Sequence, residues 1–340
     1  MGTYVYVPST SGESMQIFGM DPSSGRLTKR DEFSLGRPGC PVCTDPERRF
    51  LYVGVWEGES AGILSFKIDP ESGGLTRIGD VPLEGNACYL STDRSGRYVL
   101  ASYYMGGLAT THRVGDDGAL TEPQVDRQVT EQGAHWIGAD ASNSVVFVPH
   151  VAAANSIYQF RFDTDSGRLT PNAGTPRLAC SDGYGPRHMA WHPRLDVVYA
   201  DNEQDSSVSV YRIDRDNGTL AEEQTVSTLP PEGHEGNSNA QIAIHPGGRF
   251  IYASNRGHDT IAMFAIDETT GHISAIGRQP SEKVPRCLGI EPEGRFLFAA
   301  GDESDRLVSY AIGDDGVLQP TGDAHELGCN PGWVLPVKVG

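Results

Sequence analysis

QIAIHPGGRFIYASN (241–255) and IAMFAIDETTGHIS (261–274) form one unit of a repeat that runs through the whole chain. The unit reads as an apolar strand, a turn such as His-Pro, an Arg-aromatic strand, a loop, an apolar strand ending in Asp, and a turn with Gly-x-Leu or Gly-x-Ile. Comparable first halves occupy residues 41–55, 89–103, 136–150, 188–202 and 287–301. Their alternation of apolar and polar positions, with many β-branched and aromatic residues, is typical of β-strands.

The spacing of the repeat predicts the architecture. The apolar residue that follows the turn glycine falls at Leu27, Leu75, Leu120, Leu169, Leu220, Ile273 and Leu318. Seven units in 340 residues give roughly 49 residues per unit, which is the size of one four-stranded propeller blade. We therefore expect an all-β protein, a seven-bladed β-propeller of four-stranded antiparallel blades, with residues 1–340 as a single domain.

The two ends of the chain predict how the ring closes. The first unit lacks its opening strand, and residues 330–337 (NPGWVLPV) resemble that missing strand with no further unit after it. We expect the C-terminal strand to complete the first blade beside the N-terminal strands, because closure removes an open sheet edge.

Composition narrows the possible partners. The chain has 45 acidic and 27 basic residues and a formal net charge of −18. Such a surface repels phosphate backbones and anionic membranes, so we expect neither nucleic acid nor membrane as a partner. The start of the chain has no basic and apolar leader pattern, and its six cysteines are scattered, which favours reduced thiols and a cytoplasmic location. A closed ring predicts a monomer.

Three motif matches are better explained by the repeat. Gly58-Glu59-Ser60-Ala61-Gly62 has the form of a nucleophile elbow, but a strand pattern follows it where an elbow requires a helix. Cys40-x-x-Cys43 has no second pair and lies in a predicted strand. The segment 214–218 lacks the acids of a calcium loop and coincides with a repeat turn. The sequence predicts no metal and no cofactor.

The candidate site comes from polar residues where each unit enters its first strand or leaves its second. In a propeller these loops meet at one mouth of the central channel, where blade packing does not require polar side chains. Four of them combine an imidazole, a carboxylate and two guanidiniums, a set that can bind an anion and move protons: His135, Arg187, Glu203 and Arg256. We expect these four to form a functional cluster; the alternative is that the Arg–Glu pairs only tie neighbouring blades together. Expected substrate contacts at the same rim are His188, Asn202, Asn255, His258, Arg286, His150 and Glu57.

Two motifs carry a resemblance to a known family. Gly185-Pro186-Arg187-His188 and Ser254-Asn255-Arg256-Gly257-His258, within seven repeats that span the chain, resemble the seven-bladed propeller lactonases. That family includes propeller-type 6-phosphogluconolactonase and carboxy-cis,cis-muconate cyclase. The resemblance implies that His135, Arg187, Glu203 and Arg256 match the family's proposed active-site residues. The chain departs from the family pattern at Gly85-Asn86-Ala87-Cys88, at Pro149-His150 and at Ala300-Gly301-Asp302, which bears on the identity of the substrate.

The expected function is metal-independent hydrolysis of an anionic sugar-acid or organic-acid lactone, similar to 6-phosphogluconolactonase. The two arginines would hold the anion and stabilise charge on the lactone carbonyl, and either Glu203 or His135 would activate water. Two alternatives stay open. One is a lactonising cycloisomerase that acts on a muconate-like diacid, and the other is a non-catalytic binding platform that presents Trp56, Tyr103, Tyr104 and Trp136. A six-bladed calcium-dependent lactonase is disfavoured by the seven units.

Overall fold

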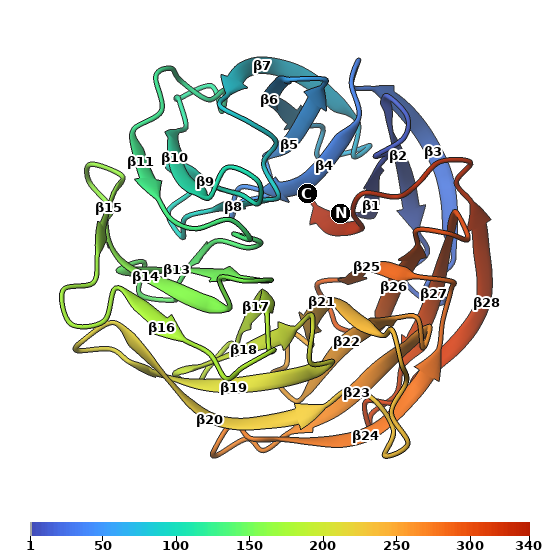
Figure 1. The fold of residues 1–340 in the computed structure, drawn as a ribbon. Coiled ribbons are helices and arrows are strands. Elements are labelled where there is room, and N and C mark those ends of the chain that lie inside the picture. Colours follow the sequence, from blue (N-terminus) through green and yellow to red (C-terminus); the bar gives the residue numbers. More distant parts are fainter. Residues whose placement is uncertain (1) are drawn as a thin grey trace.

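Seven antiparallel sheets stand around a central axis in the computed structural model, which describes residues 2–340 (Figure 1). Each sheet is one blade, and its strands follow one another outward from the axis. This confirms the predicted all-β, seven-bladed propeller. The described residues contain no helix.

The strands of each blade, from the axis outward, are as follows. Blade 1 has β29 (Leu335–Val339), β1 (Gly2–Pro8), β2 (Ser14–Met20) and β3 (Leu27–Ser34); blade 2 has β4 (Gly39–Thr44), β5 (Phe50–Glu57), β6 (Ser60–Ile68) and β7 (Leu75–Leu83); blade 3 has β8 (Tyr89–Thr92), β9 (Tyr98–Tyr103), β10 (Leu108–Arg113) and β11 (Asp126–Val129). Blade 4 has β12 (Gly138–Ala139), β13 (Val145–His150), β14 (Ser156–Asp163), β15 (Arg168–Pro171) and β16 (Arg177–Ala179); blade 5 has β17 (Pro186–Trp191), β18 (Val197–Asn202), β19 (Ser207–Asp214) and β20 (Thr219–Ser227). Blade 6 has β21 (Ser238–Ile244), β22 (Phe250–Arg256), β23 (Thr260–Ile266) and β24 (Ile273–Pro280); blade 7 has β25 (Pro285–Ile290), β26 (Phe296–Gly301), β27 (Arg306–Ile312) and β28 (Leu318–Glu326).

Blade 4 departs from the regular pattern at its outer edge. Its outermost strand comes in two pieces, because β15 pairs with the end of β14 and β16 pairs with the start of β14. The intervening residues leave the sheet, and Asn172 donates from Nδ2 to the carbonyl oxygen of Asn217 in blade 5 at 2.6 Å. The loop therefore contributes a contact between blades.

The C-terminal strand closes the ring, as the sequence predicted. β29 pairs antiparallel with β1, from Tyr6 opposite Leu335 to Gly2 opposite Val339, and both termini lie together near the axis (Figure 1). The strand begins at Leu335, five residues later than the sequence pattern indicated. The residues before it cross the mouth of the ring, where the amide of Gly332 donates to the carbonyl oxygen of Pro8 at 2.7 Å.

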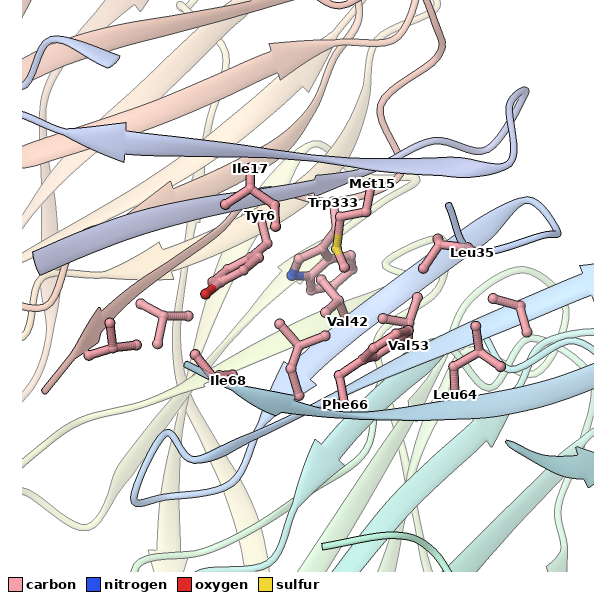
Figure 2. Close-up of a cluster of buried hydrophobic side chains, with 14 residues drawn as sticks. Tyr6, Met15, Ile17, Leu35, Val42, Val53, Leu64, Phe66, Ile68 and Trp333 are labelled. Carbon is pink, nitrogen blue, oxygen red and sulfur yellow. The ribbon is translucent and has the colours of Figure 1, made fainter. Parts of the chain in front are cut away.

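The core lies between blades, because each sheet buries both faces against its neighbours. Figure 2 shows the cluster between blades 1 and 2, in which Tyr6, Ile17, Val53 and Phe66 interdigitate with exposed fractions of 1% or less. Trp333, from the segment before β29, packs into the same cluster. The mouth of the ring and the blade core are thus continuous.

One contact recurs at all seven blade junctions. The glycine of each Gly-x-Leu or Gly-x-Ile turn has a φ between +64° and +87°. A Cβ on it would come within 2.2–2.9 Å of a side chain that opens the second strand of the preceding blade. The pairs are Gly73 with Tyr4, Gly118 with Phe50, Gly167 with Tyr98, Gly218 with Val145, Gly271 with Val197, Gly316 with Phe250, and Gly25 with Phe296. The repeated glycine therefore serves both the turn and the seam between blades.

Replacing one of these glycines tests the seam. We expect Gly118→Ala to lose about 1–2 kcal/mol from the left-handed backbone and a further ~1–3 kcal/mol from the clash with Phe50. Gly36→Ala is the matched control, because Gly36 has a φ of +72° and a Cβ there would meet nothing within 4 Å. Urea unfolding of both variants separates the two costs. Equal losses would show that the Phe50 contact adds nothing.

Candidate functional site

Four of the innermost strands begin with an irregularity in their pairing. The pairing register shifts between Gly39 and Val42, between Pro186 and Met189, between Asn239 and Ile242, and between Pro285 and Cys287. The residues skipped by these shifts include Cys40, Arg187, His188, Gln241 and Arg286. Bulges re-aim side chains out of a regular ladder, and here the re-aimed side chains meet in one place.

They line a cavity of about 280 Å³ at the mouth of the ring, which we call the axial pocket. Every blade contributes to it, mostly from the entry of its innermost strand. Its lining residues are Thr10, Cys40, Trp56, Asn86, Ala87, Cys88, Tyr104, Met105, His135, Arg187, His188, Gln241, Arg286, Cys287, Gly332 and Trp333. Of the predicted site residues, the pocket brings together His135, Arg187, His188 and Arg286.

Glu203 and Arg256 stand directly behind this lining. Glu203 Oε2 lies 3.1 Å from Arg187 Nε, and its Oε1 accepts a hydrogen bond from Arg256 at 2.8 Å. Arg256 also donates to the carbonyl oxygen of Asn239 at 2.8 Å. Arg187 is 4% exposed and Arg256 is 20% exposed. A carboxylate held between two guanidiniums compensates their burial and fixes their direction.

The imidazole of His135 has few polar contacts. Its nearest polar neighbour is the Cys88 sulfur, 3.4 Å from Nδ1. The rings of Tyr104 and His188 stand edge-on to it, with centroids 5.7 and 5.1 Å away. Burial and the positive charge of Arg187 hold the pKa of His135 well below its usual range. The imidazole is therefore neutral at neutral pH and can accept a proton.

His188 is anchored from two sides. Its amide donates to Asp201 Oδ1 at 2.8 Å, and its Nε2 lies 3.2 Å from an Nη of Arg187. Burial lowers the pKa of His188 well below the usual range and raises that of Asp201 to about 6. His188 thus supports the orientation of Arg187 at the pocket wall.

Three of the predicted substrate contacts lie outside the axial pocket and are fully buried. Asn202 donates to the hydroxyls of Ser207 and Ser209 on the neighbouring strand, each at 2.8 Å. Asn255 accepts from Thr228 at 2.7 Å and donates to Thr260 at 3.1 Å. His150 is fixed by Val148 O at 2.9 Å and Thr130 Oγ1 at 3.0 Å. These three side chains are therefore held by hydrogen bonds to nearby strands and inter-blade linkers, although Asn202 Oδ1 has no protein partner among residues 2–340.

Two more predicted contacts also lie outside the pocket lining. His258 is half-buried, and its Nδ1 is 2.8 Å from Thr260 Oγ1. Glu57 is exposed at the end of β5. Sequence position placed these residues near the mouth but could not give the direction of their side chains.

The sequence reasoning missed the sulfur and aromatic part of the lining. Cys40, Cys88 and Cys287 all line the axial pocket, whereas Cys43, three residues along the strand from Cys40, does not. Trp333 also lines it, 7% exposed, with its ring centroid 5.2 Å from that of Tyr89 and 5.8 Å from that of His188. The signal was present, since Cys40 and Cys88 occupy the strand-entry position that holds His135 and Arg187 in other units, and Cys287 occupies the next position, which holds His188 in blade 5.

A larger open cavity of about 850 Å³ lies elsewhere, between the turns of blades 1, 2 and 7. It is lined by side chains of both charges, including Arg30, Asp31, Glu293 and Lys338. None of its lining residues within 2–340 is a histidine or a cysteine. The smaller axial pocket therefore has the more useful set of groups for chemistry.

Across residues 2–340, no three His, Cys, Asp or Glu side chains are arranged to hold a metal ion. No helix in that range is long and apolar enough to cross a membrane.

Comparison with known proteins gives consistent matches over the full length. The family model described as "Lactonase, 7-bladed beta-propeller" matches residues 1–336. A 6-phosphogluconolactonase of Erwinia tasmaniensis is 34% identical over 336 residues, which is 98% of each chain. A 6-phosphogluconolactonase of Pectobacterium atrosepticum is 32% identical over 341 residues, covering both chains completely.

Solved structures share the fold. A periplasmic gluconolactonase of Pseudomonas aeruginosa superposes with a TM-score of 0.88 at 24% identity, over 99% of this chain and 100% of that one. A protein from Lactobacillus plantarum gives a TM-score of 0.89 at 21% identity, with the same coverage.

The burial of His150 leads to a stability prediction. Burial lowers the pKa of His150 to about 4, while in the unfolded chain a histidine titrates near 6.5. Between these values the unfolded state binds a proton that the folded state does not, so unfolding free energy falls as pH falls. We expect His150→Gln to reduce this loss by up to about 3 kcal/mol between pH 6.5 and 4, measured by urea unfolding at several pH values. His234→Gln, at an exposed histidine, is expected to leave the slope unchanged.

Proposed function

The chain belongs to the seven-bladed β-propeller lactonase family, and we propose that it hydrolyses the ring ester of a small anionic sugar-acid or organic-acid lactone in the axial pocket, as a 6-phosphogluconolactonase-like enzyme. The observation that carries the proposal is the meeting of a neutral imidazole, His135, and a buried guanidinium, Arg187, at one cavity wall. These are the two groups that ester hydrolysis needs, a proton acceptor for water and a positive group for the developing oxyanion.

In the proposed reaction Arg187 faces the lactone carbonyl. Water adds to the carbonyl carbon, and negative charge gathers on the carbonyl oxygen, which the guanidinium stabilises. Glu203, 3.1 Å from Nε of Arg187, holds the guanidinium in direction, and Arg256 holds Glu203 in turn. Arg187 and Glu203 thus act as a pre-oriented pair, and Arg256 is a positioning residue.

His135 is the better candidate for the base. It lines the pocket, and its lowered pKa keeps the imidazole neutral and able to take the proton of the attacking water. Collapse of the tetrahedral intermediate breaks the bond between the carbonyl carbon and the ring oxygen. The imidazolium then returns its proton to that oxygen, and the product is the open-chain hydroxy acid. Glu203 is engaged by both arginines, which leaves His135 as the free acceptor.

Replacing the Glu203 carboxylate with an amide tests the Arg187–Glu203 pair. We expect Glu203→Gln to lower kcat for lactone hydrolysis roughly 100- to 1,000-fold, because the oxyanion donor loses its fixed direction. Arg256→Met, which loosens Glu203, is expected to give a smaller loss in the same parameter. The control is Glu59→Gln at an exposed position. Full activity in Glu203→Gln, with circular dichroism showing a folded protein, would contradict the assignment.

The pH profile tests the base. Because the pKa of His135 lies well below its usual range, we expect kcat/KM to stay level from neutral to mildly acidic pH and to fall only when the imidazole protonates. His135→Gln should abolish this acid limb along with most of the activity. An acid limb near the ordinary histidine pKa of about 6.5 would contradict the lowered pKa, and an acid limb that persists in His135→Gln would rule His135 out as the base.

A further inference from the structure

The charge of the axial pocket differs from that of the rest of the protein. The chain carries 45 acidic residues, yet the side chains from residues 2–340 that line the pocket include no carboxylate and no lysine. Its formal charges come from two arginines, Arg187 and Arg286. The pocket is thus a positive and weakly polar enclosure within an acidic protein.

Three neutral thiols make one part of the lining apolar. The thiol of Cys40 donates to the carbonyl oxygen of Gly332 at 3.1 Å, that of Cys287 lies 3.7 Å from the carbonyl oxygen of Pro331, and that of Cys88 faces His135. Burial raises the pKa of each of the three to about 12, so they stay protonated. A buried thiol behaves as a small hydrophobic group and a weak acceptor.

Aromatic and thioether side chains extend this apolar surface to the rim. Trp333 is 7% exposed and packs between the pocket and the core of blades 1 and 2 (Figure 2). Trp56 and Tyr104 are half-buried, and Met105 is 73% exposed at the edge. A ligand that enters the pocket therefore first meets the aromatic rings of Trp56 and Tyr104 and the flexible apolar side chain of Met105.

The hydroxyl groups of a ligand would find no carboxylate acceptor among the described residues that line the pocket. Gln241 Oε1 already accepts from the amide of Leu288 at 3.0 Å, which leaves neutral side-chain acceptors on Thr10, Asn86, Tyr104, His135 and His188. A sugar-acid lactone carries several hydroxyls, and each one buried without an acceptor weakens binding. The lining therefore disfavours hydroxyl-rich rings.

The two arginines differ in how firmly they are engaged. Arg187 is 4% exposed and lies 3.1 Å from Glu203, whereas Arg286 is 39% exposed and its closest carboxylate oxygen, on Asp302, is 4.0 Å away. One loosely paired guanidinium can take one carboxylate in a two-point contact. Arg286 is therefore the group available for a ligand's anion.

We propose that the axial pocket selects a hydroxyl-poor, monocyclic lactone with a single carboxylate, which binds Arg286 while the ring lies against the thiols and Trp333. This inference rests on the proposed function and narrows it from anionic lactones in general to the organic-acid class. The site then discriminates against phosphorylated sugar lactones because no described residue of its lining offers their hydroxyls a carboxylate acceptor.

Four γ-lactones that differ in two properties test the inference. They are γ-carboxy-γ-butyrolactone (carboxylate, no hydroxyl), glucaro-γ-lactone (carboxylate, hydroxyl-rich), γ-butyrolactone (neutral, no hydroxyl) and gulono-γ-lactone (neutral, hydroxyl-rich), with 6-phosphogluconolactone added as a phosphorylated case. We expect kcat/KM for γ-carboxy-γ-butyrolactone to exceed every other value by roughly tenfold or more. Faster hydrolysis of glucaro-γ-lactone or 6-phosphogluconolactone would overturn the inference and leave the proposed function standing. No hydrolysis of any of the five would overturn both.

Two matched pairs of variants assign the selection to named side chains. We expect Arg286→Met to lower kcat/KM for γ-carboxy-γ-butyrolactone roughly 10- to 100-fold. The ratio of this kcat/KM to that for γ-butyrolactone should fall as well. The control Arg30→Met, at an exposed arginine outside the pocket lining, is expected to leave the ratio unchanged.

Cys88→Ser replaces a weak acceptor with a hydroxyl. We therefore expect the ratio of kcat/KM for glucaro-γ-lactone to kcat/KM for γ-carboxy-γ-butyrolactone to rise several-fold. Cys180→Ser, outside the pocket, is its control. An equal fall for all substrates in Arg286→Met would contradict the carboxylate contact.

Discussion

The seam between blades rests on one steric requirement, repeated seven times. A turn glycine with positive φ lies against a side chain that opens the second strand of the preceding blade, and no Cβ would fit there. Four tyrosines of the second strands add a hydrogen bond across the same seam to the glycine carbonyl, at 2.7–3.0 Å: Tyr6, Tyr52, Tyr199 and Tyr252. Because the last of the seven contacts joins Phe296 of blade 7 to Gly25 of blade 1, the ring is closed by packing as well as by β29.

The contacts of the seam do not involve the entries of the innermost strands. The seam glycines lie in the turns between third and fourth strands, toward the outside of each blade, and the side chains they contact open the second strands. Four of the seven innermost strands begin with a register shift, and the other shifts lie between third and fourth strands. A bulge re-aims side chains, and Arg187, His188 and Arg286 reach the pocket from such positions. The seam therefore does not restrict which residues line the mouth.

The sequence was sufficient for the fold and for part of the site, for different physical reasons. The turn glycines and the alternating strands are requirements of local geometry, and they recur in every unit, so seven blades and ring closure could be predicted. His135, Arg187, Glu203 and Arg256 stood out because charge at a strand entry or exit breaks the repeat. Asn202, Asn255 and His150 broke it equally, yet their partners are Ser207 on the adjacent strand and Thr228 and Thr130 in the linkers that lead into blades 6 and 4. The residues at the pocket and the residues buried elsewhere differ only in the direction of their side chains. That direction could not be predicted from a single sequence. The cysteines escaped notice because they look like ordinary strand residues.

The acidic charge of the whole protein and the arginines of the axial pocket act in opposite ways on an anionic ligand. A net charge of −18 opposes the approach of any anion at long range, and salt screens that repulsion beyond about 8–10 Å. Selection of an anion must therefore come from short-range contacts inside the mouth. There Glu203 is shared between Arg187 and Arg256, so it offsets one of their two positive charges and fixes the direction of both guanidiniums. Arg286, with its nearest carboxylate oxygen at 4.0 Å, is the guanidinium that the protein itself engages least. A ligand with one carboxylate matches that loosely paired group.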